Sequence, residues 1–174
     1  MAILDDLESF SKLQKTQRYI DILFQKVEDA LEKGCNDPEY QQQQQQQLIE
    51  DCNALANDIE DEIVVIHDFI RDKYGLKFPE LESLVPDPVD YARIVKRIGN
   101  EMDLTKVDLE GLLPSPVAMV VSITASTTSG EPLAEQALRE TIEACDRVLS
   151  LDSAKKKLAD FVETTRRIGS DASL

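Results

Sequence analysis

The stretch LIEDCNALANDIEDEIVVIHDFI, residues 48–70, decides the fold that this sequence predicts. Two apolar series run through it with a period of seven residues: Ile49, Ala56, Ile63 and Ile70, and between them Cys52, Ile59 and Ile66, with Leu48, Leu55 and Phe69 widening the stripe. The opposite face is acidic, with Glu50, Asp51, Asp58, Glu60, Asp61 and Asp68. Interleaved series of this kind form one apolar seam along a helix. The stretch therefore predicts a long helix that packs against a partner of comparable length.

A matching pattern occurs far downstream, between about Pro132 and Ile168. Its members recur every seven residues in the same way: Ala137, Ala144, Leu151 and Leu158, with Thr141, Val148 and Val162 between them. Lys155 interrupts this seam, and we expect it to reach an acidic residue of the facing helix. Two stripes of similar length, joined by a long insertion, predict an all-α fold with a long antiparallel two-helix coiled-coil stalk, residues 48–74 and 131–168.

The insertion, residues 75–130, predicts a small helical tip. Gly75 ends the long helix, and Asp87 caps a helix that Pro88 opens and that stops near Gly99. A short piece follows over 109–113 and ends at a proline. The run PVAMVVSITASTTSG favours a strand by its β-branched residues, but no second strand is available to pair with it. We therefore predict a buried helix that ends at Ser129-Gly130.

The N-terminal part predicts extra helices over residues 1–34, followed by a glutamine-rich linker over 35–47. The first helix carries Leu4, Leu7, Phe10 and Leu13, and the second carries Ile20, Leu23, Val27, Ala30 and Leu31 before a stop at Gly34. Seven consecutive glutamines, Gln41 to Gln47, indicate a low-complexity connector or an extension of the neighbouring helix. Residues 169–174 are expected to be a tail or an engineered junction.

Charge and composition narrow the functional classes. The 174 residues include 34 acidic and 19 basic ones, for a formal charge of −15. Such a surface repels phosphate backbones, so we expect the chain as a whole not to bind nucleic acid without a local basic site. Apolar residues make up 42% of the chain and aromatic residues only 5%, a mixture that suits aliphatic packing between helices.

The cysteines and the apolar runs indicate the compartment. Cys35, Cys52 and Cys145 are scattered and odd in number, which predicts buried thiols in a reducing compartment and neither a disulfide framework nor a zinc site. No apolar run approaches the roughly 18 residues of a membrane span. The opening MAILDDLESF lacks the features of a signal peptide. These features predict a cytosolic or nuclear protein without a membrane partner.

His67 is the single histidine and the main candidate for chemistry. A metal site needs three or four converging ligands, which a lone histidine beside Asp68 does not supply. A histidine phosphotransfer module is an alternative, because such modules are acidic helical bundles and Arg71 lies one turn on. The acidic clusters lack a calcium-binding loop, and the chain has no phosphate-binding glycine loop. We predict no catalytic residue, no metal, no cofactor and no small-molecule ligand.

A basic and aromatic cluster at the end of the long helix is the candidate partner-binding site. It consists of Arg71, Lys73, Tyr74, Lys77 and Phe78, in an otherwise negative chain. Aromatic and basic residues are enriched in recognition surfaces. The alternative is that Tyr74, Phe78 and Leu81 close the small core beneath the turn.

Residues 63–104, IVVIHDFIRDKYGLKFPELESLVPDPVDYARIVKRIGNEMDL, resemble the coiled-coil part of the Nop family, whose members organise small ribonucleoprotein particles. Two segments, FIRDKY…KFPELESLVP and MVVSITASTTSG, are more similar to the family member of the spliceosomal U4/U6·U5 tri-snRNP than to the nucleolar box C/D scaffolds. LIEDCNALANDIEDEI and EACDRVLSLDSAKKKLADFVET agree with that assignment. The likeness extends from about Leu48 to Ile168.

The resemblance implies a nuclear scaffold for tri-snRNP assembly in pre-mRNA splicing, with other tri-snRNP proteins as partners. It also implies that the RNA-binding Nop domain, which would contact U4 snRNA and its kink-turn protein, is missing beyond Ile168. A box C/D snoRNP scaffold is the alternative within the family. The phosphotransfer module is the alternative outside it.

Overall fold

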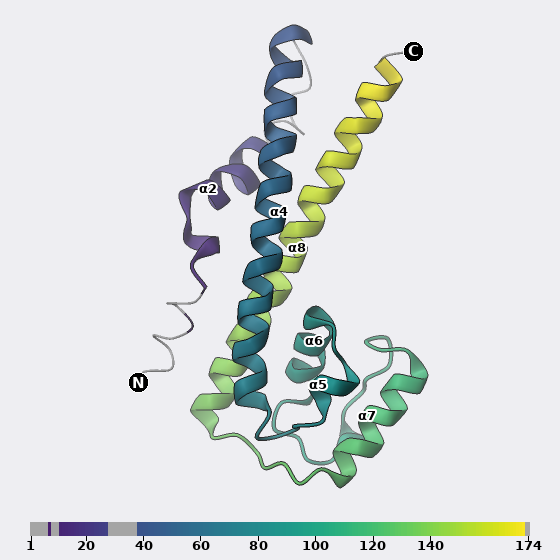
Figure 1. Ribbon diagram of the computed structural model, residues 1–174. Coiled ribbons are helices and arrows are strands. Elements are labelled where there is room, and N and C mark those ends of the chain that lie inside the picture. Colours follow the sequence, from purple (N-terminus) through teal and green to yellow (C-terminus); the bar gives the residue numbers. More distant parts are fainter. Residues whose placement is uncertain (1–6, 8–10, 28–37, 173–174) are drawn as a thin grey trace. The chain divides into compact units, whose positions relative to one another are not determined.

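The computed structural model describes residue 7, residues 11–27 and residues 38–172 (Figure 1). Its elements are η1 (Leu13–Lys15), α2 (Gln17–Ile20), the π-helical turn η2 (Asp21–Lys26), α4 (Pro38–Tyr74), α5 (Leu81–Leu84), α6 (Pro88–Ile98), η3 (Leu104–Lys106), α7 (Ser115–Thr127) and α8 (Glu135–Ala172). Within the described residues there is no β-strand, and a single isolated bridge joins Glu110 and Leu113. The prediction of an all-α fold is confirmed.

The chain divides into two compact units. The first unit contains Met1–Ser11 and Ile63–Ser150, and the second contains Lys12–Glu62 and Leu151–Leu174. The helices α4 and α8 contribute residues to both units, while α5, α6, η3 and α7 belong to the first unit alone.

The buried residues of α4 follow the pitch of an ordinary α-helix more closely than the predicted period of seven. The buried apolar residues are Leu48, Cys52, Leu55 and Ile59 in the second unit, and Ile63, Ile66, Ile70 and Tyr74 in the first, where His67 is buried as well. Ile49 and Ala56, two predicted seam residues, are only half-buried. An undistorted helix drifts by about 20° per heptad, so Leu48 and Leu55 take the inner positions at the start of α4.

On α8 the period of seven is retained. Thr141, Ala144 and Val148 are buried in the first unit, and Leu151, Leu158 and Val162 in the second. The predicted seam residue Ala137 is half-buried. In the second unit, Lys155 forms an ion pair with Glu60 of α4, which confirms that this lysine reaches an acidic residue of the other long helix.

In the first unit, the last turn of α4 meets the start of α8, where Lys73 Nζ lies 3.4 Å from Glu140 Oε2. This is the contact that an antiparallel helix pair makes at this end. The helix α6 begins and ends as predicted, because the Asp87 side chain accepts a hydrogen bond from the Asp90 N–H and Gly99 adopts a φ of 54°. Residues 109–113, predicted as a short piece before Pro114, form a turn around the isolated bridge.

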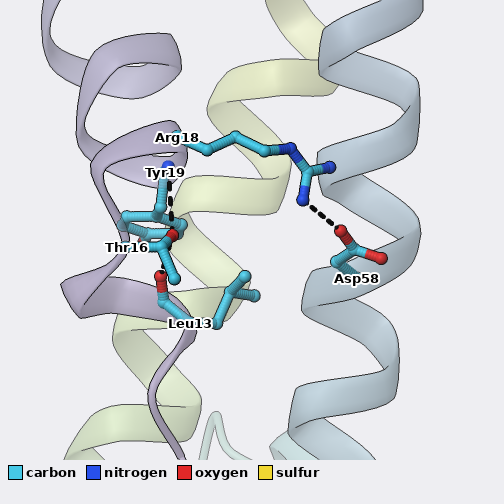
Figure 2. Close-up of polar contacts among 5 residues, drawn as sticks. All are labelled: Leu13, Thr16, Arg18, Tyr19 and Asp58. Carbon is cyan, nitrogen blue, oxygen red and sulfur yellow. Dashed lines mark hydrogen bonds and ion pairs between the residues drawn. The ribbon is translucent and has the colours of Figure 1, made fainter.

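In the second unit, the N-terminal segment packs against both long helices. The Thr16 side chain caps α2 by accepting a hydrogen bond from the Tyr19 N–H, and Arg18 forms an ion pair with Asp58 of α4 (Figure 2). The distance between Arg18 Nη1 and Asp58 Oδ2 is 2.6 Å. Lys157 Nζ of α8 donates to the Leu23 carbonyl at 3.3 Å and lies 5.7 Å from the centre of the Phe24 ring. Tyr19, Ile22, Leu23 and Val27 are buried. The described part of the second predicted N-terminal helix, up to residue 27, therefore consists of short helical turns with one apolar side.

One prediction on the N-terminal half needs a correction, and others fall outside the described residues. The glutamine run is part of α4 and is no separate linker, as the alternative of a helix extension predicted. The first predicted N-terminal helix and the stop at Gly34 lie almost entirely outside the described residues, as does Cys35.

Candidate protein-interaction surface

The structure places three of the five predicted site residues in the core of the first unit. Tyr74 is 0% exposed, and Lys77 and Phe78 are each 1% exposed. The Tyr74 hydroxyl donates a hydrogen bond to the Gly99 carbonyl at 2.8 Å, which ties the end of α4 to the end of α6. The alternative, that Tyr74, Phe78 and Leu81 close a small core, is confirmed, because all three side chains are buried.

The other two predicted residues are partly exposed and already engaged within the unit. Lys73 pairs with Glu140 of α8 and lies 4.9 Å from the centre of the Phe69 ring. Arg71 forms an ion pair with Asp68 on its own helix. A role of Arg71 and Lys73 in binding a partner stays a prediction.

Lys77 carries a basic group into the apolar interior. Burial lowers the pKa of Lys77 from its ordinary value, and the negative charge of Glu101 raises it in part. The sequence suggested a surface because basic and aromatic residues alternate here. The same alternation arises where a long lysine stem packs along a core, so the pattern alone could not distinguish the two.

His67 is also packed against the interior. Its ring meets the Tyr91 ring edge-on, with centroids 5.1 Å apart, and its Nε2 is buried without a hydrogen-bond partner among the described residues. Burial lowers the pKa of His67, as does Arg71, and the acidic groups of Asp68, Asp87 and Glu82 oppose them. A phosphotransfer histidine must present a ring nitrogen to a partner domain, and this geometry does not favour that role.

The thiols of Cys52 and Cys145 are buried and free, as predicted for two of the three cysteines. Burial raises the pKa of Cys52 to about 11 and that of Cys145 to about 12, so both thiols stay protonated and unreactive at neutral pH. Within the described part of the chain, no cluster of three or more His, Cys, Asp or Glu residues could hold a metal ion. No helix of that part is long and apolar enough to cross a membrane.

The surface that sequence reasoning missed lies on α7. This helix was predicted to be buried, but only Val121 and Ala125 are buried in it. Met119 is 65% exposed, Val120 47% and Ile123 59%. In Figure 1, α7 lies at the edge of the group that it forms with α5 and α6. The signal that could have revealed an exposed side is the ending of the helix in serine and threonine residues.

The described part of the chain is thus all-helical, and its first unit combines buried polar side chains with an exposed apolar face on α7. The family described as "Nop: snoRNA binding domain, fibrillarin" matches residues 55–168. The chain belongs to this family.

Among its curated relatives, the U4/U6 small nuclear ribonucleoprotein Prp31 homolog of Arabidopsis thaliana is 58% identical over 170 residues, which cover 92% of this chain and 34% of the relative. The U4/U6 small nuclear ribonucleoprotein Prp31 of Mus musculus is 40% identical over 172 residues, or 92% of this chain and 33% of the relative. Nucleolar protein 58 of Neurospora crassa is 28% identical over 114 residues, or 66% of this chain and 19% of the relative. The chain thus spans about a third of the length of the Prp31 relatives that it matches.

These matches correct one prediction. The sequence resemblance implied that the RNA-binding Nop domain is missing, but the family description that names a snoRNA-binding domain matches residues 55–168. The prediction of a missing domain is therefore not supported.

Proposed function

We propose that this protein is a pre-mRNA splicing factor that serves as an assembly scaffold in the U4/U6·U5 tri-snRNP. The observation that carries the proposal is the 58% identity over 92% of the chain to a U4/U6 small nuclear ribonucleoprotein. The spliceosomal and nucleolar names of the relatives support a location in the nucleus.

The first unit supports a role in contacts with other proteins of the particle. The charged or titratable side chains of His67, Lys77 and Glu140 are buried in this unit and are not exposed as reactive groups. The formal charge of −15 disfavours phosphate binding by the surface as a whole, whereas the exposed apolar side of α7 favours a protein. We propose that the protein is not an enzyme.

We further propose that α4 and α8 form the antiparallel coiled-coil stalk that the sequence predicts. The ion pair of Glu60 with Lys155 in the second unit supports it, as does that of Lys73 with Glu140 in the first. The strict spacing of Thr141, Ala144, Val148 and Leu151 on α8 is the spacing of a coiled-coil seam.

A role as a box C/D snoRNP scaffold is the second candidate, since the nucleolar relative is 28% identical over 66% of the chain. Sedimentation of an extract through a glycerol gradient distinguishes the two. We expect the protein to sediment with U4, U6 and U5 RNAs in the same fractions. Sedimentation with box C/D RNAs and fibrillarin, and absence from the U4/U6·U5 fractions, would instead support the snoRNP role.

A further inference from the structure

The exposed side of α7 is an apolar stripe without charge. Ile123 lies four residues after Met119 and three after Val120, which places the three residues on one side of the helix. Pro116, one turn earlier, is also exposed. The helix Ser115–Thr127 contains no charged residue. No described residue covers this α7 stripe, defined as Pro116, Met119, Val120 and Ile123.

The α7 stripe lies in an acidic part of the first unit. Between residues 100 and 138 there are six acidic residues and one basic one, Lys106: the acids are Glu101, Asp103, Asp108, Glu110, Glu131 and Glu135. The elements that contact α7 most are η3 and α5. Asp103 and Asp108 flank η3 and are exposed, and Glu82 of α5 is exposed. The segments that flank α7 in the sequence are therefore acidic, with Lys106 of η3 as their one basic residue.

This combination selects one class of ligand. An apolar helix face of this width is covered by the apolar side of another amphipathic helix. Acidic neighbours attract lysine and arginine and repel carboxylates and phosphates. A second copy of this chain would bring a like-charged surface to the stripe, and an anionic membrane or a nucleic acid would bring phosphates.

We propose that the α7 stripe binds an amphipathic helix of a partner protein, with apolar residues against Met119, Val120 and Ile123 and basic residues facing the acidic neighbours. The inference deepens the proposed function and rests on it for the biological setting. The binding chemistry itself follows from exposure and charge.

The test uses the whole chain and two synthetic peptides. Both peptides are amphipathic helices with the same leucine stripe; one carries lysines on its flanks and the other glutamates. We expect fluorescence anisotropy to detect binding of the lysine peptide, at least about tenfold tighter than that of the glutamate peptide, and weakening with added salt.

Substitution on the stripe locates the contact. The double variant Met119→Ser/Ile123→Ser removes two exposed apolar groups without opening the core, and we expect it to bind the lysine peptide at least about tenfold more weakly. Val64→Ser is the matched control, because Val64 is another exposed apolar residue of the first unit, 53% exposed on α4. We expect this control to bind like the parent chain, and circular dichroism should show equal helicity for all three proteins.

Several results would overturn the inference. They are equal affinity for both peptides, no binding of the lysine peptide, or equal binding by the double variant. Self-association in sedimentation equilibrium that the double variant loses would identify a second copy of the chain as the occupant. Binding to phosphatidylserine vesicles or to poly(U) RNA that the double variant loses would identify a phosphate-bearing ligand as the occupant. The gradient experiment on the unmodified protein is independent of these results, so failure of the stripe and failure of the splicing role can be told apart.

Discussion

Among the described glycines of the first unit, Gly130 has the least room for a side chain. An added Cβ would lie 1.9 Å from the Lys77 carbonyl oxygen and 2.4 Å from the Lys77 carbonyl carbon. Both are backbone atoms, held in place by the hydrogen bond from the Glu131 N–H to the Leu76 carbonyl at 2.9 Å. A glycine at this position lets the segment after α7 approach the segment after α4.

We expect Gly130→Ala to lower the free energy of unfolding by about 1–3 kcal/mol or more, because the backbone must shift to relieve the overlap. Urea denaturation followed by circular dichroism measures the change. Ser129→Ala, at the exposed neighbouring position, is the control and should be close to neutral. Equal stability of the glycine and alanine proteins would contradict the close approach.

His67 makes the stability of the first unit dependent on pH. Because burial lowers its pKa below the ordinary histidine value of about 6.5, the unfolded chain binds a proton at a pH where the folded chain does not. Stability should therefore fall as the pH decreases from 7 through 6.5 towards the folded pKa.

We expect this decrease to be smaller in His67→Gln than in the parent chain, since glutamine does not titrate. Urea denaturation at a series of pH values from 7 down to 5 measures both slopes. Identical slopes for the two proteins would show that His67 does not titrate differently in the folded and unfolded states.

At the residue scale, the sequence predicts what depends on local chemistry. Asp87 as a helix cap and Gly99 as a helix stop follow from the preferences of those residues, and both are confirmed. The close approach at Gly130 involves the backbone of Lys77, some 50 residues away in the sequence. It therefore cannot be predicted from the residues around Gly130. Burial of Lys77 is hidden for the same reason, because a lysine next to aromatic residues is equally common on a surface.

At the scale of elements, Asn100 joins the end of α6 to the segment that precedes α8. Its side-chain nitrogen donates to the Leu133 carbonyl, and its side-chain oxygen accepts from the Leu133 N–H, each at 2.8 Å. Leu133 is buried, so both of its backbone groups depend on this one side chain.

We expect Asn100→Ala to reduce stability by about 1–3 kcal/mol, because it leaves buried polar groups without partners. Asn100→Asp is the informative companion, since it keeps the acceptor and loses the donor. Hydrogen exchange at the Leu133 amide should be fast in the alanine protein and slower in the aspartate protein. Unchanged protection of this amide in the alanine protein would rule out the bridge.

The two long helices of the second unit are expected to depend on apolar packing far more than on their ion pair. Lys155 and Glu60 have side chains that are 37% and 56% exposed, and exposed pairs contribute about 0–1 kcal/mol. Leu158 is 1% exposed, and truncation of a buried leucine costs about 2–5 kcal/mol.

Lys155→Ala should therefore change the unfolding free energy little, and Leu158→Ala should lower it strongly. Chemical denaturation of the two variants side by side gives the comparison. A larger loss in the lysine variant than in the leucine variant would contradict this assignment of the seam.

Element types follow from periodicity, while their depth in the fold does not. The sequence predicts α4, α6, α7 and α8 as helices, all of which the structure contains. The prediction that α7 is buried is wrong. A run of apolar and β-branched residues occurs both in helices buried within their own chain and in helices that bind another chain, so the sequence alone does not distinguish them. At the start of α4, Leu48 and Leu55 are buried in place of the predicted seam residues Ile49 and Ala56. The reason is that an ordinary helix does not keep a period of seven residues.

At the scale of the whole molecule, the all-α class is confirmed, and membership in the Nop family rests on the match to residues 55–168. The continuous coiled-coil stalk and the division into stalk and tip stay predictions. The net charge of −15 acts at this scale as well, because it favours partners that carry positive charge.

Sequencing of the RNA that co-purifies with the tagged protein from its own cells tests the splicing role most directly. We predict enrichment of U4, U6 and U5 small nuclear RNAs over an untagged control, with box C/D RNAs at background. If box C/D RNAs were enriched and the three spliceosomal RNAs stayed at background, the assignment to the tri-snRNP would be contradicted.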